Sequence, residues 1–327
     1  MKQIKRIGVY TSGGDAPGMN AAIRAVVRTA LYNGLKVTGI YRGYEGMIEG
    51  DFKEMVSRSV SSILQKGGTV LKSARCPEFR TPEGRKKAYE NIKEAEIDAL
   101  VAIGGDGTFT GAEIFSQEYD IPVMCIPGTI DNDLYGSDYT LGFDTANNTV
   151  IDAIDKIKDT AASHNRLFFV EVMGRDSGCI ALNAGVAGGA EAIMLPEKDT
   201  AIDELIDMLE TAKHRNKTSM IVIVAEGDKN GGAYHVAKRV NEKFDYYDTK
   251  VSILGHLQRG GSPSSFDRVL ATRMGYFAVN ELIKGNRSAT VGIRGSQIVS
   301  TSLEEALRGK EFKLDEELVT ISQVMNI

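Results

Sequence analysis

Short apolar runs alternate with amphipathic stretches along most of the chain, and this alternation limits the possible fold more than any other feature. The amphipathic pattern is clearest over 144–162, where Val150, Ile151, Ile154 and Ile157 recur at helical spacing. Alternating strands and helices are typical of a parallel sheet with helices on both faces. The apolar runs predict strands at 7–10, 35–40, 100–103, 123–126, 167–172, 220–225, 251–254 and 290–293.

Hydroxyl residues mark three places where helices are expected to begin. Thr81 is followed by proline, and Thr200 and Ser302 each precede a carboxylate residue by three positions, as in a capping box. Another helix is expected over 21–30. The number of strands would also allow a closed barrel, but glycine turns at the ends of several strands favour an open sheet.

Composition excludes several classes of protein. The chain has 327 residues, of which 42% are hydrophobic and 25% charged, and this excludes a disordered or collagen-like chain. Its net charge is −5 and it has no basic stripe, so no nucleic-acid partner is expected. The apolar runs are too short to cross a bilayer. Three widely spaced cysteines argue against a disulfide framework or a zinc site and predict a cytoplasmic protein.

Glycine is abundant, with 35 residues against 7 prolines, which indicates tight turns rather than flexible linkers. Several expected strands end in a glycine turn that carries a carboxylate, at 12–15, 104–107 and 226–228. In open α/β sheets, ligands bind beyond the carboxyl ends of the strands. The pattern therefore predicts a cleft for a phosphorylated ligand.

The first of these turns lies in 11–20, TSGGDAPGMN, which follows a strand and opens a helix. Backbone N–H groups at such a turn attract anions. Gly13 and Gly18 have the spacing of a Walker phosphate loop, but Met19 and Asn20 replace its lysine and hydroxyl residue. The segment also lacks the dinucleotide pattern GxGxxG. Phosphate binding is favoured over a plain strand–helix turn.

Glycines flank Asp106 in the segment 103–108, IGGDGT. One interpretation of Asp106 is an ordinary helix N-cap. The other is a carboxylate that holds Mg²⁺ beside a nucleotide phosphate, because Mg²⁺ is usually bound by one or two carboxylates plus phosphate oxygens. The glycines on both sides favour the magnesium interpretation.

Two carboxylates, Asp131 and Asp133, follow the next expected strand in the segment 127–133, PGTIDND. Both can be turn formers that make Asx bonds. Alternatively, because alternate positions of an extended segment face the same side, they can act as a general base and its orienting partner. The two interpretations are evenly balanced.

Cys179 follows the segment GRDSG at 174–178 and could be a nucleophile at the start of a helix. Free cysteines more often pack as small buried hydrophobes. We therefore expect Cys179 to be buried and unreactive.

Six segments together resemble the bacterial-type ATP-dependent 6-phosphofructokinase family. Each is weak alone, but all six occur in register over about residues 5–309, nearly the whole chain, which makes the resemblance specific. They are 11–20, 104–108, 127–133, GFDTA at 142–146, EVMGR at 171–175 and LGHLQRGGSP at 254–263.

The resemblance implies a fold of two doubly wound α/β (Rossmann-like) domains with mainly parallel sheets, the second inserted in the first. The ATP-binding domain would comprise 1–142 plus 255–305. The fructose 6-phosphate-binding domain would comprise 143–254 plus 306–327. No linker in the sequence marks these boundaries, and the homotetramer that the family forms is likewise implied by the resemblance alone.

The resemblance also implies that the γ-phosphate of ATP is transferred, with Mg²⁺, to the 1-hydroxyl of D-fructose 6-phosphate, the committed step of glycolysis. In pyrophosphate-using relatives, the residues that match Gly107 and Gly128 are aspartate and lysine. A carboxylate at 107 would repel the α-phosphate of ATP by about 1–4 kcal/mol at about 4 Å, so glycine there favours ATP. The alternatives are a pyrophosphate-dependent phosphofructokinase and a non-catalytic phosphosugar-binding regulator, although a regulator would not need Asp106 and Asp131.

Residue by residue, the resemblance assigns roles in catalysis and binding. Asp131 would take the hydroxyl proton, Thr129 and Arg175 would flank the transferring group, and Asp106 would hold Mg²⁺. The residues that would cradle ATP are Gly14, Arg75, Cys76, Gly105, Asp106, Gly107 and Thr108. Those that would bind the sugar phosphate are Thr129, Asp131, Met173, Gly174, Arg175, Glu226, His256 and Arg259, with Arg166 and Lys250 of a neighbouring subunit. The alternatives are ordinary surface charge for the arginines and a core position for His256.

Some residues depart from the family pattern. Lys250 stands where arginine is usual, which replaces a bidentate contact with a point charge, and Asp176 adds a carboxylate after Arg175. The family's intersubunit effector pocket, for ADP or phosphoenolpyruvate, is partly kept, but Ser57 and Lys158 stand where arginines are usual. The effector-binding candidates are Arg24, Arg28, Gly189, Glu191, Arg215, which replaces a lysine, and Lys217; a solvated basic face is the alternative.

Overall fold

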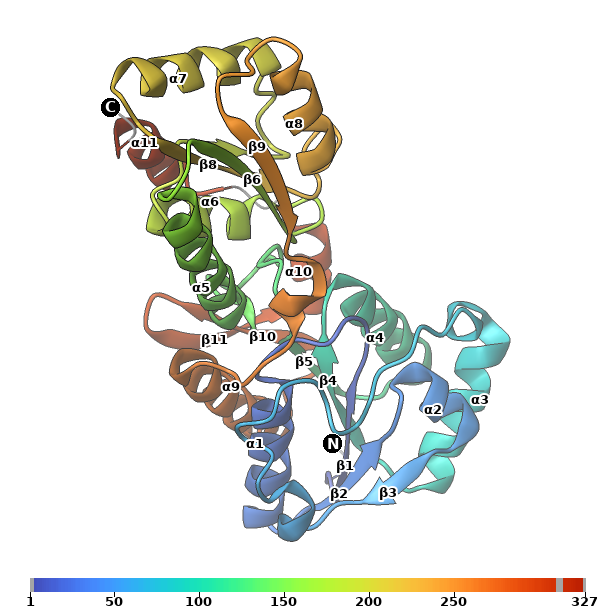
Figure 1. The fold of residues 1–327 in the computed structure, drawn as a ribbon. Helices are drawn as coiled ribbons and strands as arrows, with labels where there is room; N and C mark the ends of the chain where they lie inside the picture. Colours follow the sequence, from blue (N-terminus) through green and yellow to red (C-terminus); the bar gives the residue numbers. More distant parts are fainter. Residues whose placement is uncertain (1–2, 310–313, 326–327) are drawn as a thin grey trace. The chain divides into compact units, whose positions relative to one another are not determined.

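The computed structural model describes residues 3–309 and 314–325 (Figure 1). The chain forms two compact α/β units. Unit 1 comprises Met1–Thr129, Leu134–Thr145 and Arg259–Glu311, and the remaining segments form unit 2. The main segment of unit 2, Ala146–Gln258, is therefore inserted in the sequence of unit 1.

Unit 1 is built on a seven-stranded sheet in the order β11-β10-β5-β4-β1-β2-β3. The inner strands pair in parallel, whereas the edge strands β3 and β11 pair with their neighbours in antiparallel fashion. The strands are β1 (Arg6–Thr11), β2 (Lys36–Ile40), β3 (Phe52–Glu54), β4 (Ala99–Gly104), β5 (Val123–Pro127), β10 (Ala289–Arg294) and β11 (Gln297–Ser302).

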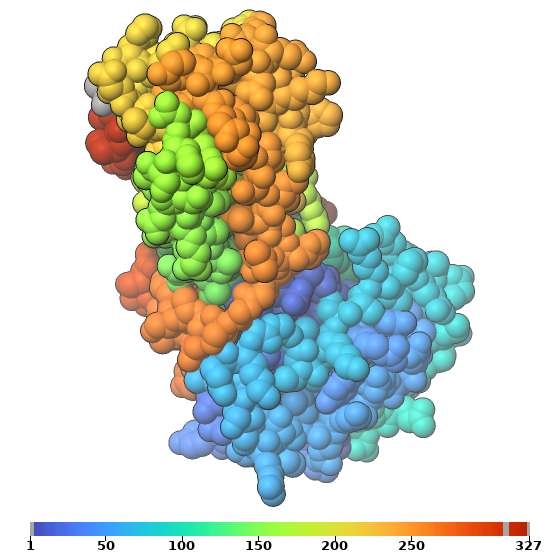
Figure 2. All heavy atoms as spheres, viewed as in Figure 1, coloured from blue at the N-terminus to red at the C-terminus, as the bar shows by residue number. Residues whose placement is uncertain are grey.

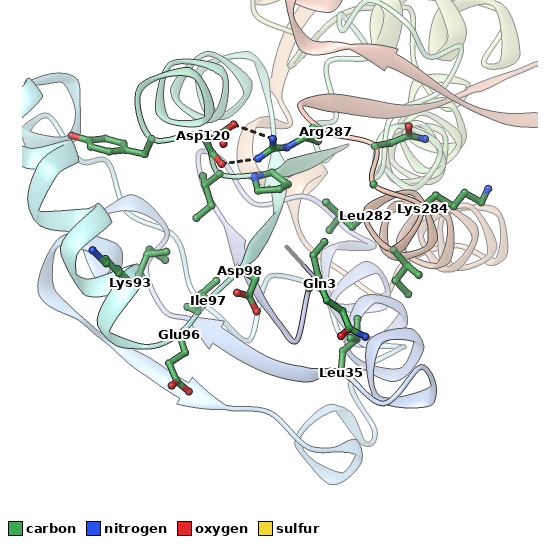
Figure 3. Close-up of a pocket in the computed structure, with 18 of the residues that line it drawn as sticks. Gln3, Leu35, Lys93, Glu96, Ile97, Asp98, Asp120, Leu282, Lys284 and Arg287 are labelled. Atoms are coloured by element: carbon green, nitrogen blue, oxygen red, sulfur yellow. Dashed lines mark hydrogen bonds and ion pairs between the residues drawn. The ribbon is translucent and has the colours of Figure 1, made fainter. Parts of the chain in front are cut away.

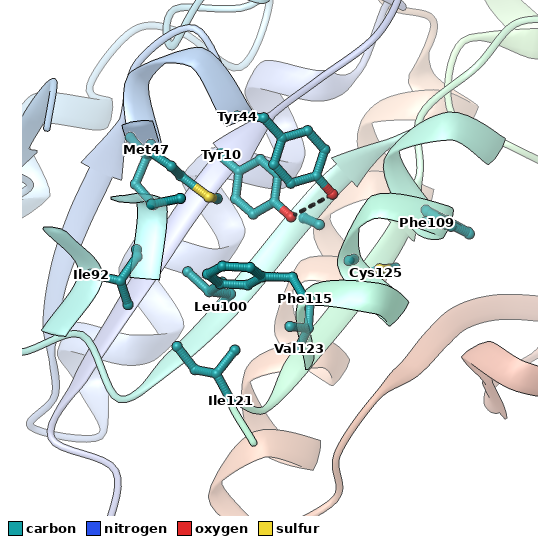
Figure 4. Packing of buried hydrophobic residues seen from close by; sticks show 14 of the residues in the cluster. Tyr10, Tyr44, Met47, Ile92, Leu100, Phe109, Phe115, Ile121, Val123 and Cys125 are labelled. Carbon is teal, nitrogen blue, oxygen red and sulfur yellow. Dashed lines mark hydrogen bonds between the residues drawn. The ribbon is translucent and has the colours of Figure 1, made fainter. Parts of the chain in front are cut away.

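Helices cover both faces of this sheet, because its inner strands project apolar side chains to both sides. Helices α1 and α9 pack together on one face, and the remaining helices of the unit lie on the other (Figure 1). On that second face, Tyr10, Leu100, Phe115 and Val123 belong to a buried core cluster (Figure 4). The helices are α1 (Met19–Tyr32), α2 (Tyr44–Glu49), α3 (Pro82–Glu94), α4 (Asp106–Tyr119), α9 (Ser265–Ile283) and α10 (Leu303–Arg308), with 3-10 turns η1 (Ser57–Val60) and η2 (Glu78–Arg80).

Unit 2 has a four-stranded, fully parallel sheet in the order β7-β8-β6-β9. Helices α7 and α8 share a buried core with one face of the sheet. Helix α6 packs on β7 and β8, and α11 packs on α6. The strands are β6 (Arg166–Val172), β7 (Ala192–Met194), β8 (Ser219–Ala225) and β9 (Asp248–Ile253). The helices are α5 (Phe143–Ala161), α6 (Cys179–Ala187), α7 (Ile202–His214), α8 (Gly232–Asn241) and α11 (Glu316–Met325), and the 3-10 turn η3 (Gly255–Arg259) follows β9.

Helix α5 illustrates how the apolar pattern is used. Val150 and Ile154 are fully buried, and Ile151 and Ile157 are half-buried, as their helical spacing predicts. The polar side of the helix faces outward and forms a strip on the surface of unit 2 (Figure 2, green). The predicted helix over 144–162 is confirmed to within one residue at each end.

The strand predictions are confirmed, with three omissions. Each predicted apolar run overlaps an observed strand, and the sheets are open rather than closed into a barrel. The run predicted at 251–254 begins earlier, at Asp248, because β9 starts with polar residues. Strands β3, β7 and β11 were not predicted; β3 and β7 have three residues each, and β11 is largely polar.

Two of the three predicted helix caps are confirmed. The hydroxyl of Thr81 accepts a hydrogen bond from the Gly84 N–H, and the hydroxyl of Ser302 accepts one from the Glu305 N–H. The prediction at Thr200 is wrong, because α7 begins at Ile202 after an extended Ala201 that makes no side-chain cap.

The division into units differs in detail from the expected domain ranges. The segment Ile130–Asp133 groups with unit 2, although it lies within the range 1–142 expected for the first domain. The other divisions follow Thr145, Gln258 and Glu311. The ligand that each unit binds stays a prediction.

None of the helices in residues 3–309 and 314–325 combines the length and the apolar character needed to span a membrane.

Candidate active site

Three segments singled out in the sequence follow neighbouring strands of unit 1. In register, Thr11 of β1 pairs with Ile103 of β4, and Gly104 pairs with Pro127 of β5. The Ser12 N–H donates to the Ile103 carbonyl at 3.1 Å, and the Gly128 N–H donates to the Gly104 carbonyl at 2.9 Å. The three turns therefore lie at one edge of the sheet, which we call the turn edge of unit 1.

Glycine occupies the positions of the turn edge for different physical reasons. A Cβ at Gly104 would lie 2.4 Å from the Ser12 carbonyl oxygen and 2.4 Å from Thr108 Oγ1, so this glycine is required by backbone packing. A Cβ at Gly105 would lie 3.8 Å from Thr129 Cβ, which places Thr129 against the turn. A Cβ at Gly107 would meet no atom of the rest of the described chain within 4 Å. Gly107 therefore borders open space, where backbone and ligand can approach closely.

Asp106 is the first residue of α4, and Gly105 occupies the N-cap position. The N-cap interpretation of Asp106 is therefore wrong. Its side chain is exposed and makes no hydrogen bond with any residue that the structure describes. The helix dipole favours a negatively charged group at this position, whether a carboxylate or a bound anion.

Metal binding at this edge would depend on Asp106. Among the described residues, no group of three or more His, Cys, Asp or Glu side chains is arranged to hold a metal ion. A single exposed carboxylate nevertheless fits Mg²⁺, since this ion commonly takes one or two protein carboxylates and completes its shell with phosphate oxygens and water.

Arg259, predicted to bind the sugar phosphate, lies in unit 1 against the first turn. Its Nη1 donates to the Asp15 carbonyl at 3.3 Å, and a Cβ at Gly14 would lie 2.8 Å from this Nη1 atom. Gly14 therefore leaves room for the guanidinium. The structure brings Arg259 together with Gly14, a predicted ATP residue.

The segment that leads to Arg75 and Cys76 packs on the same turn. The Thr11 hydroxyl donates to the Lys72 carbonyl at 2.7 Å, and the Ser73 hydroxyl donates to the Gly13 carbonyl. Arg75 is exposed, while Cys76 is half-buried and packs against the core cluster of unit 1. Burial raises the pKa of the Cys76 thiol, so it is neutral at physiological pH.

In unit 2, Asp131 is buried, with 5% of its surface exposed. The Ser177 hydroxyl donates to the Asp131 carbonyl at 2.8 Å and holds the backbone of this segment. Asn132, which follows, has a left-handed backbone with φ of 53°. Asp133 is half-buried, so Asp131 is the more completely withdrawn from solvent of the two carboxylate residues.

A second set of predicted residues gathers where β6 and β8 end. The Glu226 N–H donates to the Val172 carbonyl at 2.9 Å, and Glu226 Oε1 accepts hydrogen bonds from the backbone N–H groups of Gly174 at 3.3 Å and Arg175 at 2.7 Å. Gly174 has φ of 140°, and a Cβ there would lie 2.3 Å from the Ser177 carbonyl oxygen. Glu226 thus fixes the turn that carries Arg175, whose side chain is exposed.

Met173 and His256 belong to the same end of the sheet. The Met173 N–H donates to Oε1 of the fully buried Gln258 at 3.1 Å, which ties η3 to the end of β6. His256 of η3 is exposed, so the interpretation as a core histidine is wrong. No role is predicted for Gln258 from the sequence, although this residue lies within the motif at 254–263.

Arg166 and Lys250 lie elsewhere in unit 2. Arg166 begins β6, and Lys250 pairs with Phe168, so both are near the strand starts. Asp248 bridges them, with its Oδ1 2.6 Å from Lys250 Nζ and its Oδ2 3.5 Å from Arg166 Nε; the hydrogen bond from Lys250 is the main cause of its lowered pKa. Six residues of β6 at about 3.3 Å each separate Arg166 from Val172 by about 20 Å. Within one chain, these cations do not join Met173–Arg175.

The candidate effector residues fall into two groups. Glu191 and Lys217 of unit 2 form an ion pair at 3.2 Å, and Glu191 also accepts a hydrogen bond from the Ile221 N–H at 2.6 Å. Gly189 has φ of 55° and lies near Lys158, with 3.5 Å between a Cβ there and Nζ. The remaining candidates are Arg215, which ends α7, and Arg24 and Arg28, which lie one turn apart on α1 in unit 1.

Cys179 is the first residue of α6 and is buried, as predicted. Burial raises the pKa of its thiol to about 12. A thiol with this pKa is almost entirely protonated at neutral pH and is a poor nucleophile.

A cavity of about 830 Å³ lies at the other edge of the sheet of unit 1, where β1, β4 and β5 begin (Figure 3). Ile97, Asp98 and Leu282 line it, and an ion pair between Arg287 and Asp120 at 3.0 Å borders it. No residue predicted for catalysis or binding lines this cavity.

Comparisons with known proteins agree with the resemblance. The family model described as Phosphofructokinase matches residues 6–282. The chain is 55% identical to ATP-dependent 6-phosphofructokinase 2 of Bacteroides thetaiotaomicron over 328 residues, with 100% of both chains covered. It is 52% identical to ATP-dependent 6-phosphofructokinase of Cytophaga hutchinsonii, with 99% of this chain and 98% of the relative covered.

A solved structure of phosphofructokinase from Saccharomyces cerevisiae has the same fold, with a TM-score of 0.89 and 37% identity. The match covers 98% of this chain and 47% of the yeast chain, so this chain spans about half of that protein. Full-length similarity and the shared fold lead to one assignment. The chain belongs to the phosphofructokinase family.

Proposed function

We propose that this protein is an ATP-dependent 6-phosphofructokinase. It transfers the γ-phosphate of ATP to the 1-hydroxyl of D-fructose 6-phosphate and releases fructose 1,6-bisphosphate and ADP. The observation that carries the proposal is the 55% identity, over the full length of both chains, to a relative named for this activity. The two units supply suitable groups for each substrate.

In this proposal, Asp131 is the general base. Its carboxylate is buried, and a buried carboxylate can accept the proton of the sugar 1-hydroxyl as the oxygen attacks phosphorus. Arg175, exposed on a turn fixed by Glu226, neutralises charge on the transferring group together with Thr129. Phosphoryl transfer depends mainly on positioning and charge neutralisation of this kind.

ATP would bind at the turn edge of unit 1. Its phosphates would lie along Gly14 and Gly105–Thr108, with Arg75 and Cys76 at the border, and Asp106 would hold Mg²⁺. When bound, the ion would supply positive charge that offsets the negative charge of the phosphates. Asp106 suits this role, since its carboxylate is exposed and has no hydrogen-bonding partner among the described residues.

The choice of ATP over pyrophosphate is supported by the surroundings of two glycines. The open space beside Gly107 suits the α-phosphate and the nucleoside. Gly128 is enclosed, since a Cβ there would lie 3.0 Å from Met19 Cε and 3.2 Å from Ile103 Cγ2. A lysine at 128, as in pyrophosphate-using relatives, would therefore require these side chains to move.

The 6-phosphate of the sugar would be held by His256 and Arg259 and, from a neighbouring subunit, by Arg166 and Lys250. The separation of about 20 Å along β6 supports a contribution from a second chain. We therefore include a homotetramer in the proposal and expect it to be measurable by light scattering on the purified protein. ADP or phosphoenolpyruvate would act through the candidate effector residues.

The proposal is tested by a coupled assay with ATP and pyrophosphate as donors and by the variant Asp131→Ser. Removal of the base is expected to lower kcat by about 10²–10⁴-fold while fructose 6-phosphate still binds. Asp228→Asn is a matched control, because Asp228 is also a buried carboxylate of unit 2 and is not among the individual residues proposed to react with or bind a substrate. An unchanged kcat in Asp131→Ser, or activity with pyrophosphate alone, would refute the proposal.

A further inference from the structure

A buried tyrosine, Tyr44, donates a hydrogen bond to the Gly104–Thr108 turn and packs near the other two segments to which the proposed function assigns ATP binding. It is the first residue of α2 and has 6% of its surface exposed. We propose that Tyr44, supported by Tyr10, is a positioning residue that sets the Gly104–Thr108 turn for ATP. This inference rests on the proposed function and concerns residues to which that proposal assigns no contact with the nucleotide.

The link between these residues is a chain of hydrogen bonds, of which Figure 4 shows the one between the hydroxyls of Tyr10 and Tyr44. The Tyr44 hydroxyl donates to the Thr108 carbonyl in the first turn of α4 at 2.6 Å. The Tyr10 hydroxyl, at the end of β1, lies 3.1 Å from the Tyr44 hydroxyl. The Thr108 hydroxyl continues the chain to the Ser12 carbonyl at 3.1 Å. The first and second turns of the turn edge are thus connected through buried polar groups.

The direction of these bonds is fixed by chemistry. A carbonyl oxygen can only accept, so the single proton of the Tyr44 hydroxyl goes to Thr108. The Tyr10 hydroxyl must then donate to Tyr44. Burial raises the pKa of both phenols, so both remain protonated donors over the physiological range. Loss of the Tyr44 hydroxyl therefore breaks two bonds, whereas loss of the Tyr10 hydroxyl breaks one and leaves the bond to Thr108.

A glycine in α4 permits the contact. Gly111 lies three residues after Thr108 and therefore on the same side of the helix. A Cβ at Gly111 would lie 2.9 Å from both Cζ and the hydroxyl oxygen of Tyr44. Glycine inside a helix is less favourable than alanine. The close approach of Tyr44 accounts for its presence here.

The ring of Tyr44 packs next to the third segment. It stacks on Phe79 with 3.9 Å between ring centroids, and Phe79 lies in η2, three residues after Cys76. Cys76 itself packs against the same core cluster. The residue before Tyr44 is also close to the first turn, since a Cβ at Gly43 would lie 2.7 Å from the Thr11 carbonyl oxygen. A shift of Tyr44 would therefore move several ATP-binding segments together.

The test compares Tyr44→Phe, Tyr10→Phe and Gly111→Ala with the control Tyr247→Phe. Tyr247 is a buried tyrosine of unit 2 whose hydroxyl also donates to a backbone carbonyl, that of Lys217, at 2.6 Å. Tyr44→Phe is expected to raise KM for ATP about 3- to 10-fold and Tyr10→Phe less, with KM for fructose 6-phosphate unchanged in both. Tyr247→Phe should leave KM for ATP unchanged.

Gly111→Ala should raise KM for ATP as Tyr44→Phe does, although alanine is the better helix former. The double variant Tyr44→Phe/Gly111→Ala should raise KM for ATP only as much as the more severe single variant does, because both changes remove the hydrogen bond from Tyr44 to the Thr108 carbonyl. Equal rises in KM for both substrates, an effect no larger than that of Tyr247→Phe, or additive effects in the double variant would overturn the inference.

A second readout separates this inference from the proposed function. Hydrogen exchange of the amides of 104–112 does not require activity, and Tyr44→Phe should accelerate it more than Tyr247→Phe does. If the wild-type protein does not use ATP, the proposed function fails while this measurement still tests the positioning role. Unchanged exchange in Tyr44→Phe would overturn that role.

Discussion

Replacement of Gly107 by aspartate is expected to weaken ATP use without weakening the fold. Gly107 is the second residue of α4 and is exposed, and beyond its own helix backbone no atom of the described residues lies within 4 Å of the position that a Cβ would take. Its φ is not in the left-handed region. A side chain therefore fits without moving any neighbour, and what Gly107→Asp changes is the charge beside the proposed phosphate site.

The substitution has opposite effects on the stability of the fold and on the use of ATP. Glycine is among the least favourable residues in a helix, and a carboxylate in the first turn gains about 0.3–1 kcal/mol from the helix dipole, so the free energy of unfolding should stay the same or rise slightly. A phosphate about 4 Å from the new carboxylate is repelled by about 1 kcal/mol in water and about 4 kcal/mol at a partly buried site. This range corresponds to a fall in kcat/KM for ATP of about 5- to 1,000-fold.

The assay measures kcat/KM for ATP and thermal unfolding in Gly107→Asp and in the isosteric, neutral control Gly107→Asn. The asparagine variant should keep most of the activity, and added salt should narrow the difference between the two variants, because salt screens exposed charges. An equal loss in both variants would mean that size, not charge, matters. Full activity in both would refute the placement of ATP phosphates beside Gly107.

Two further predictions concern groups that the structure buries. Cys125 and Cys179 should react with a thiol reagent only after unfolding, since at pH 8 a pKa of about 12 leaves about one thiolate in 10⁴ for Cys179; labelling of either in the native protein faster than of half-buried Cys76 would contradict this. Asp267 accepts hydrogen bonds from the Gly142 and Thr145 backbone, and burial raises its pKa. Its contribution to stability is therefore greatest below the unfolded pKa and is lost as pH rises through the folded one. Relative to Asp267→Asn, the unfolding free energy of the wild type in urea should fall over that interval, and a rise would refute the argument.

The sequence predicted the central strands well because they are apolar throughout. Strands β4 and β5 are fully buried along their lengths, and such runs have few alternatives to a central position in a parallel sheet. The strands that were missed lie at edges and carry less signal. Strand β11, QIVSTS, pairs on one side only and is mostly polar, so burial does not select its residues.

The reason for a glycine could not be predicted from sequence. Gly104 and Gly107 stand three residues apart in one motif, yet the first is required by contacts with Ser12 and Thr108, and the second borders open space. Gly14 makes room for Arg259, which is more than 240 residues away in the chain. Such contacts depend on long-range packing, and local patterns carry no information about it.

The covalent chain limits how far Asp131 can lie from the turn that contains Asp106. Asp131 belongs to unit 2, but it follows Thr129 of unit 1 by two residues, and two extended residues span at most about 7 Å between Cα atoms. Thr129 Cβ lies 3.8 Å from the position of a Cβ at Gly105, the neighbour of Asp106. Covalent geometry thus keeps the proposed base near the turn that would carry Mg²⁺ and the phosphates.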